Sequence, residues 1–405
     1  MEFEKISNFM TMLNFFLGAI LIIGIFTRID MMAQKISPHD LGKSFKLIET
    51  FDLLDEELSQ TTFTETNKLF ITTKNRKTNQ WIYRLGDMKR EISPCNNSSN
   101  KEKFSLGGAI SDENLFVNFC PDFSFEVWNL NTAKKLLSFQ AKKDKTRDFI
   151  LPYVSRDGER IIFKPSLLSE EAELWNAKSG TKEATLTSSF VDCLYCNRSV
   201  YQTVFSPDSK KIAVSFGGIV IVYDAKTGKI LHSLKDEKVH LYSSDALSHN
   251  GVVSQILFSN DSRMLFTGSY DGITKAWNAE TGDLLQTLKS HKDRITALAL
   301  SPDGKTLATG SRDDHFKLWD VGTGKELLKS KDNKNTVKIL SFSPDGKKIL
   351  SITDYEIYMW ELATGNLLEH LRSPDELSVR FSPDWRYVFV KNKNKMLNTY
   401  EYTGR

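Results

Sequence analysis

The chain has 405 residues, of which 40% are hydrophobic, 26% charged and 11% aromatic. This composition excludes a wholly disordered chain, a collagen-like fibre and a membrane protein with many spans. The 54 basic residues outnumber the 51 acidic ones by only three, so the charge gives no reason to expect a nucleic-acid partner. Four cysteines are too few for a disulfide scaffold but enough for one or two bridges.

An apolar stretch opens the chain at residues 6–26, and it is long enough to cross a bilayer as a helix. We favour an uncleaved single-span membrane anchor within residues 1–34, with a cleaved signal peptide and a buried soluble helix as alternatives. The basic residues that follow favour a cytoplasmic location for the rest of the chain. An apolar segment so near the start favours export instead, so the side of the membrane stays open.

From residue 41 onward the chain repeats one unit. A turn signal of the Ser-Pro-Asp-Gly type recurs, as at Ser301–Gly304 and Ser343–Gly346, and a short β-rich run follows each copy. An aromatic anchor then closes each unit, at spacings of roughly 40 to 54 residues. The anchors are Trp81, Trp128, Trp175, Tyr223, Trp277, Trp319, Trp360 and Tyr400. Each unit is therefore predicted to be a sheet of four antiparallel strands, a to d, which buries its faces by stacking in a ring.

The chain resembles the WD40-repeat β-propeller family over about residues 41–405. The strongest match is Ile295–Asp320, with Thr309-Gly310-Ser311-Arg312-Asp313 and Leu318-Trp319-Asp320. The resemblance implies a structural His–Ser/Thr–Asp–Trp tetrad in two units. Its members map to His249, Ser269, Asp271, Trp277 and to His291, Ser311, Asp313, Trp319.

The resemblance weakens elsewhere. In the seventh unit Asp354 and Trp360 keep the six-residue spacing, but Ile352 stands where the Ser is expected. The first three units lack the Trp-Asp signature.

The two ends of the chain predict how many blades the propeller has. The last unit stops after the strand around Tyr400, and the segment 44–51 resembles an outermost strand d. This N-terminal strand is expected to complete the last blade, which makes an all-β propeller of eight blades preceded by one N-terminal hydrophobic helix. Seven blades is the alternative, if Phe63–Ile92 is not a blade.

No catalytic motif is present, so we expect a protein that is not an enzyme and needs no cofactor or metal. His249 and His291 are expected to make structural hydrogen bonds that lead to the Trp indole. Among the cysteines, Cys95 and Cys120 lie in two connections that meet at the top of the second blade, where a disulfide could replace the polar tetrad. Cys193-Leu194-Tyr195-Cys196 is open to three interpretations: free loop thiols or a local bridge, a redox pair, or half of a zinc site.

The top of the ring, where the d-to-a and b-to-c connections meet, is the predicted docking face. Tyr270 and Arg312 each precede a tetrad Asp, and His240 and Tyr242 lie in the long connection Lys235–Asn250. Aromatic and Arg side chains are frequent anchors of protein interfaces. A solvated loop is the alternative for this connection.

We therefore predict a non-catalytic scaffold that is held in the membrane through residues 6–26 and docks protein partners on its top face. One alternative is an extracytoplasmic quinoprotein-like propeller that acts as an enzyme or small-ligand binder. Another is a structural subunit of a membrane complex.

Overall fold

The computed structural model divides the chain into two units, Met1–Lys35 and Ile36–Arg405. All described residues lie in the second unit. They are 45–52, 56–63, 69–75, 81–85, 88–92, 107–111, 115–120, 124–132, 134–140, 152–164, 169–188, 199–238, 248–289, 291–331, 333, 335–372, 378–382, 385, 387–391 and 396–402. The predicted membrane segment at residues 6–26 lies outside these ranges. Within them, no helix has the length and apolar character needed to span a bilayer.

Within the described residues, the second unit consists of eight four-stranded antiparallel sheets, as the repeats predict. We call the sheets blades one to eight in chain order. Blade one contains β2 (Glu56–Phe63), β3 (Leu69–Asn75), β4 (Trp81–Leu85) and β5 (Met88–Ile92), and blade two contains β6 (Gly107–Ile110), β7 (Leu115–Phe119), β8 (Ser124–Asn129) and β9 (Lys134–Gln140). Blade three contains β10 (Tyr153–Val154), β11 (Arg160–Phe163), β12 (Glu171–Asn176) and β13 (Lys182–Thr187), and blade four contains β14 (Val200–Phe205), β15 (Lys211–Phe216), β16 (Ile219–Asp224) and β17 (Ile230–Leu234).

The remaining blades follow the same order of strands. Blade five contains β18 (Val253–Phe258), β19 (Met264–Ser269), β20 (Ile273–Asn278) and β21 (Leu284–Lys289), and blade six contains β22 (Ile295–Leu300), β23 (Thr306–Ser311), β24 (Phe316–Asp320) and β25 (Glu326–Lys329). Blade seven contains β26 (Ile339–Phe342), β27 (Lys348–Ile352), β28 (Glu356–Glu361) and β29 (Leu367–Arg372), and blade eight contains β30 (Ser378–Phe381), β31 (Tyr387–Lys391), β32 (Met396–Tyr402) and β1 (Phe45–Asp52).

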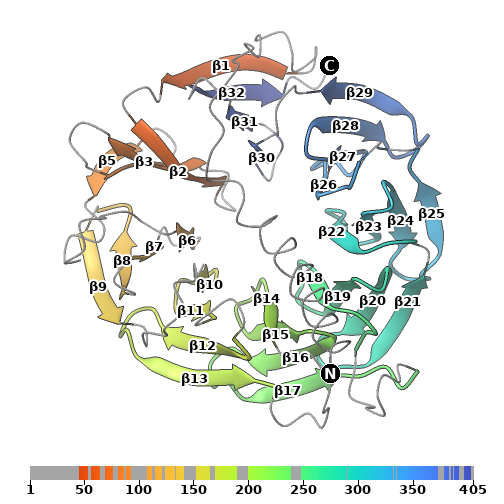
Figure 1. Cartoon of the computed structure of the whole chain (residues 1–405), viewed down its shortest axis with the longest axis horizontal. Helices are drawn as coiled ribbons and strands as arrows, with labels where there is room; N and C mark the ends of the chain where they lie inside the picture. Colours follow the sequence, from red (N-terminus) through yellow and green to blue (C-terminus); the bar gives the residue numbers. More distant parts are fainter. Residues whose placement is uncertain are drawn as a thin grey trace, which may run out of the picture. The chain divides into compact units, whose positions relative to one another are not determined.

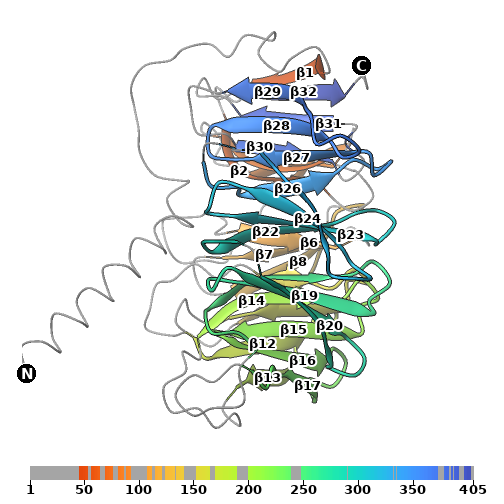
Figure 2. The same ribbon diagram turned by 90° about the vertical axis from the view of Figure 1, so that its right-hand side faces the viewer.

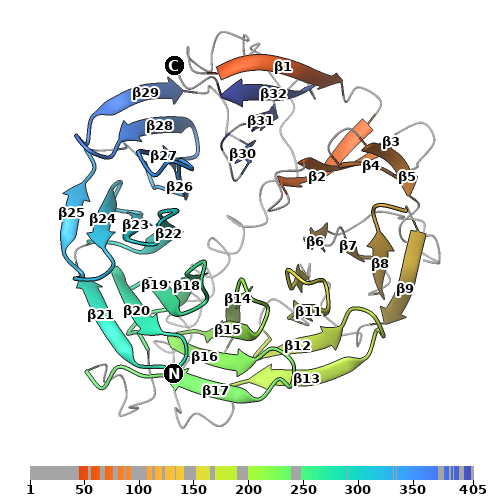
Figure 3. The ribbon, with the colours of Figure 1, turned by 180° about the vertical axis from the view of Figure 1, so that it is seen from behind.

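The blades of this unit follow one another around a ring, with the first strand of each complete blade innermost (Figure 1). The view from behind shows the same order (Figure 3), and the side view shows the ring of blades from its edge (Figure 2). The strand β1 pairs antiparallel with β32, from Phe45 opposite Tyr402 to Asp52 opposite Met396. The last blade is thus assembled from the two ends of the unit, and this pairing covers an edge that an open sheet would expose.

The hydrophobic core lies between the blades. One cluster of fully buried side chains joins Val220 and Val222 of blade four to Leu265 and Trp277 of blade five. Similar clusters join blades two and three, three and four, five and six, and six and seven. Because these clusters cover blades three to six on both faces, their middle strands are nearly continuous apolar runs, as in β16.

Candidate functional site

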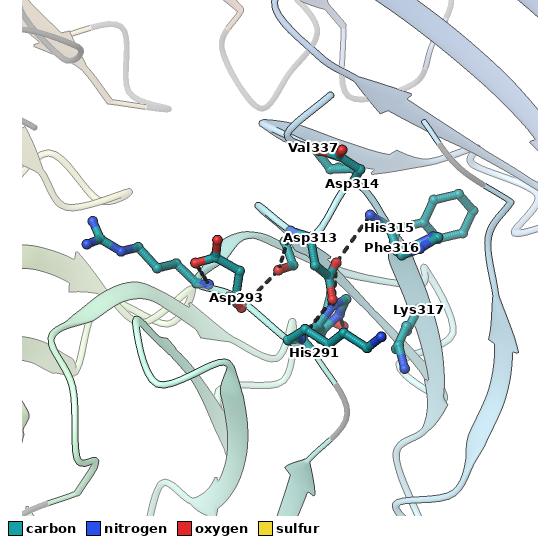
Figure 4. Close-up of polar contacts among 12 residues, drawn as sticks. His291, Asp293, Asp313, Asp314, His315, Phe316, Lys317 and Val337 are labelled. Atoms are coloured by element: carbon teal, nitrogen blue, oxygen red, sulfur yellow. Dashed lines mark hydrogen bonds and ion pairs between the residues drawn. The ribbon is translucent and has the colours of Figure 1, made fainter. Parts of the chain in front are cut away.

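Blade six carries a chain of hydrogen bonds that runs from its top edge into its core. His291 Nδ1 lies 3.0 Å from Asp313 Oδ2, and His291 Nε2 lies 2.8 Å from Thr309 Oγ1. The Trp319 indole N–H donates to the same hydroxyl at 2.9 Å. Figure 4 shows how the histidine and the aspartate approach each other from two neighbouring connections. The chain therefore ties the connection between β21 and β22 to the strand β24.

Blade five repeats this arrangement. His249 Nε2 lies 2.7 Å from Thr267 Oγ1, which accepts the Trp277 indole N–H at 2.9 Å. His249 Nδ1 faces Asp271 Oδ2 at 3.3 Å. Since the hydroxyl already accepts the indole proton, its own proton is available for Nε2, and the proton on Nδ1 then points at the carboxylate. Each network is thus satisfied from the carboxylate to the indole.

The predicted hydroxyl members of these tetrads are wrong: Thr267 and Thr309 take the place assigned to Ser269 and Ser311. In β19, Leu265 stands opposite Trp277, and Thr267 is the next residue on the same face. Ser269, at the end of the strand, instead accepts the Asp271 backbone N–H at 3.2 Å. A Thr ten residues before each Trp was the sequence signal that could have found the correct hydroxyl.

Ser311 does a different job in blade six. Its hydroxyl donates to the Asp293 carbonyl at 2.9 Å and accepts the Asp313 N–H at 3.1 Å. It therefore joins the two top connections of blade six.

Blades two, three and seven satisfy the anchor Trp in other ways. In blade seven the Trp360 indole donates to Ser351, whose hydroxyl donates to Asn333 Oδ1 at 2.7 Å. Ser351 thus supplies the hydroxyl, although the spacing of the motif predicts it one residue later, at Ile352. In blades two and three the indole donates to a buried carboxylate two residues earlier on the same strand. The pairs are Trp128 with Glu126 and Trp175 with Glu173, and the carboxylates also bind Lys135 and Lys182.

Burial shapes the ionisation of the two histidine networks. His249 is 1% exposed, and this burial lowers its pKa below the ordinary 6.5. For Asp271 and Asp313, burial alone would raise the pKa. Hydrogen bonds from His249 and His291 and from backbone N–H groups outweigh it, so both pKa values lie below the usual range. At neutral pH the carboxylates are charged and turned inward.

The two histidine networks are arranged to hold the top connections in place, and their hydroxyl groups are not available to react with a substrate. The hydroxyls of Thr267 and Thr309 are 0% exposed and already engaged, so neither can act as a nucleophile on an incoming molecule. Within the described ranges, no three His, Cys, Asp or Glu side chains are placed to hold a metal ion. The networks instead fix the position of the residues next to them on the top edge.

We expect acid to weaken the propeller through His249. The unfolded chain takes up a proton near pH 6.5 while the buried imidazole in the folded state resists it. Stability therefore falls as the pH drops through 6.5 towards the lower folded pKa, by at most about 1.4 kcal/mol per pH unit. The free energies of unfolding obtained from urea titrations at about pH 7.5 and 5.5 should differ by about 1 kcal/mol more in the wild type than in His249→Gln. An equal loss in both proteins would contradict this.

Four exposed side chains lie in the top connections of blades five to seven, and we call them the rim patch: Tyr270, Arg294, Arg312 and Tyr355. The Arg294 guanidinium lies 4.3 Å from the ring centroid of Tyr270. The Arg312 N–H donates to the Arg294 carbonyl at 3.0 Å, which places the two arginines on adjoining connections. Tyr270 and Tyr355 are 39% and 44% exposed. Arg294 and Tyr355 were missed in the sequence because no motif marks them.

Of the residues predicted in the long connection and of the four cysteines, the structure describes only Cys120. His240 and Tyr242 lie outside the described residues. Cys120 is fully buried and disulfide-bonded, and the Asn118 amide donates to its sulfur at 3.5 Å. The other three cysteines lie outside the described residues, so the pairing of Cys120 with Cys95 stays a prediction.

The two blades that contain the histidine networks match a known protein family. Residues 241–278 and 282–320 match the family described as "WD domain, G-beta repeat". The chain contains WD40 repeats. The two matched WD40 repeats include both tetrads in full and extend from the connection before β18 to the end of β24.

Relatives of this chain include other WD-repeat proteins. It is 26% identical over 179 residues to "WD repeat-containing protein 82" of Drosophila melanogaster, which covers 44% of this chain and 50% of the relative. It is 26% identical over 204 residues to "COMPASS component SWD3" of Saccharomyces cerevisiae, with coverage of 50% and 59%. The matches thus span little more than half the length of these relatives.

Proposed function

We propose that this WD40 propeller is a non-catalytic scaffold that docks protein partners on the top edge of blades five to seven. The observation that carries the proposal is the rim patch: exposed Tyr and Arg side chains next to buried, fully hydrogen-bonded networks. Tyr and Arg supply most of the binding energy in many interfaces. Because Arg294 lies on the Tyr270 ring and the Arg312 backbone is hydrogen-bonded to Arg294, less conformational entropy is lost when a partner docks.

Relatives support the same reading. One of them is named "COMPASS component SWD3", and we propose a comparable role for this chain as a component of an assembly or as a docking subunit. A tether through residues 6–26 remains part of the proposal. It rests on the apolar character of that stretch in the sequence.

The proposal is tested by removing the aromatic part of the rim patch. In Tyr270→Ala/Tyr355→Ala, we expect the yield of proteins co-isolated with the propeller from its native cells to fall at least about fivefold, since truncation of such anchors costs over 1 kcal/mol each. The matched control is Leu285→Ala/Leu327→Ala, which removes two exposed apolar side chains from the outer strands β21 and β25. Loss of the partners in the control as well, or their retention in the tyrosine variant, would contradict docking at the rim patch.

A further inference from the structure

The two arginines of the rim patch point to the chemistry of the docked segment. We infer that the patch binds an acidic stretch of a partner protein, with Arg294 and Arg312 contacting Asp or Glu carboxylates; this inference rests on the proposed docking function. Both arginines are exposed, and the backbone hydrogen bond between them keeps their connections side by side. Among the described residues, no carboxylate forms an ion pair with either guanidinium.

The nearest buried carboxylates do not neutralise these arginines. Asp313 accepts hydrogen bonds from the backbone N–H groups of Lys292 and His315 and faces His291 with both oxygens. Figure 4 shows this carboxylate directed at the histidine. Asp271 is used in the same way in blade five, where it accepts the Ile273 N–H at 2.9 Å. Asp271 and Asp313 therefore make their hydrogen bonds within the fold and do not pair with the arginines of the rim patch.

The remaining charges in the described parts of the connections around Arg294 and Arg312 leave a small positive excess. Exposed Lys292 and Lys331 add to the two arginines, while Asp293 and Asp314 oppose them. Asp293 accepts the Arg294 backbone N–H at 2.7 Å. Asp354 of blade seven is already paired with Lys338. Among the described residues of the connections around Arg294 and Arg312, four cations thus face two carboxylates, which favours an acidic partner over a basic one.

The geometry of the arginines favours carboxylates in particular. A guanidinium presents a planar fork of N–H donors that matches the two oxygens of a carboxylate. The Tyr270 ring holds the Arg294 fork in one place, which lowers the entropy lost on binding. Four cations are too few to expect tight binding to a nucleic-acid backbone, whose affinity grows with each phosphate neutralised.

The test uses the propeller with a fluorescein-labelled peptide of about twelve alternating Glu and Asp residues, followed by fluorescence anisotropy in about 50 mM salt. We expect Arg294→Ala/Arg312→Ala to weaken binding at least about tenfold. The matched control, Arg263→Ala, removes an exposed arginine from the a-to-b turn at the opposite edge of blade five and should leave the affinity unchanged. Unchanged circular dichroism in both variants shows that they fold.

Three results would overturn the inference: no binding of the peptide to the wild type, equal binding to the double variant, or tighter binding of an oligothymidine with the same charge. Failure here is separable from failure of the proposed docking. If the tyrosine variant loses its partners while the acidic peptide does not bind, the docking site stands and only the acidic chemistry falls. If the peptide binds as expected but the tyrosine variant keeps its partners, the scaffold proposal falls instead.

Discussion

Asp313→Ala should lower the free energy of unfolding by about 2–3 kcal/mol. The side chain is 8% exposed and accepts hydrogen bonds from two backbone N–H groups while facing the His291 imidazole. Its removal leaves these donors without an acceptor, and an unsatisfied buried donor costs more than the bond itself contributed. The loss should be centred on blade six, because the connection entering that blade is held by this carboxylate.

Chemical unfolding and hydrogen exchange of β23 and β24 measure this effect. The control is Asp303→Ala, in the a-to-b turn of the same blade, where an exposed carboxylate accepts from Ser301 Oγ and the Lys305 N–H. That substitution should cost less than about 1 kcal/mol. Equal losses in the two variants would show that the network is not what stabilises blade six.

Trp385→Gly should lower the free energy of unfolding by about 2–4 kcal/mol. Trp385 occupies the left-handed position of its turn, with φ of 58°, where Gly304 and Gly346 stand in blades six and seven. Yet its side chain is 2% exposed, and its indole donates to Ser341 of blade seven at 2.8 Å. Glycine would relieve about 1 kcal/mol of backbone strain and forfeit the 3–5 kcal/mol of a buried Trp side chain. The net loss falls on the junction between blades seven and eight.

The control is Ser262→Gly, which changes the same turn position in blade five. Ser262 has φ of 61°, and its hydroxyl accepts the Asp208 N–H of blade four at 3.1 Å. Relief of strain should nearly offset the lost hydrogen bond, so the urea midpoint should move little. A Trp385→Gly variant as stable as the wild type would mean that this indole does not secure the ring.

The blade architecture could be predicted because local signals agree with the global pattern. A turn before the b strand in most blades and an aromatic residue in each c strand recur at similar spacings, and each local choice fits the same ring. The His and Asp members of the tetrads were predictable for the same reason. They lie at fixed offsets from Trp277 and Trp319.

The parts that could not be predicted depend on three-dimensional neighbours. Thr267 and Ser269 lie on the same face of β19, and the choice between them depends on the strand register. Because the register places Leu265 opposite Trp277, Thr267 is the nearer of the two hydroxyls to the indole. In blades two and three the indole N–H donates to Glu126 and Glu173 in place of a hydroxyl. These buried carboxylates are each paired with a lysine on the outer strand, which sequence alone does not show. Arg294 joined the rim patch only because blade five brings Tyr270 beside it.

The central claim is that partners dock on the top edge of blades five to seven, and site-specific photo-crosslinking in native cells tests it most directly. One photoreactive residue would replace Tyr355 on the top edge, and another would replace Lys305, which is exposed in the a-to-b turn on the opposite edge. We predict that the partner crosslinks from position 355 and not from position 305. A crosslink from position 305 alone, or equal crosslinks from both, would contradict the account.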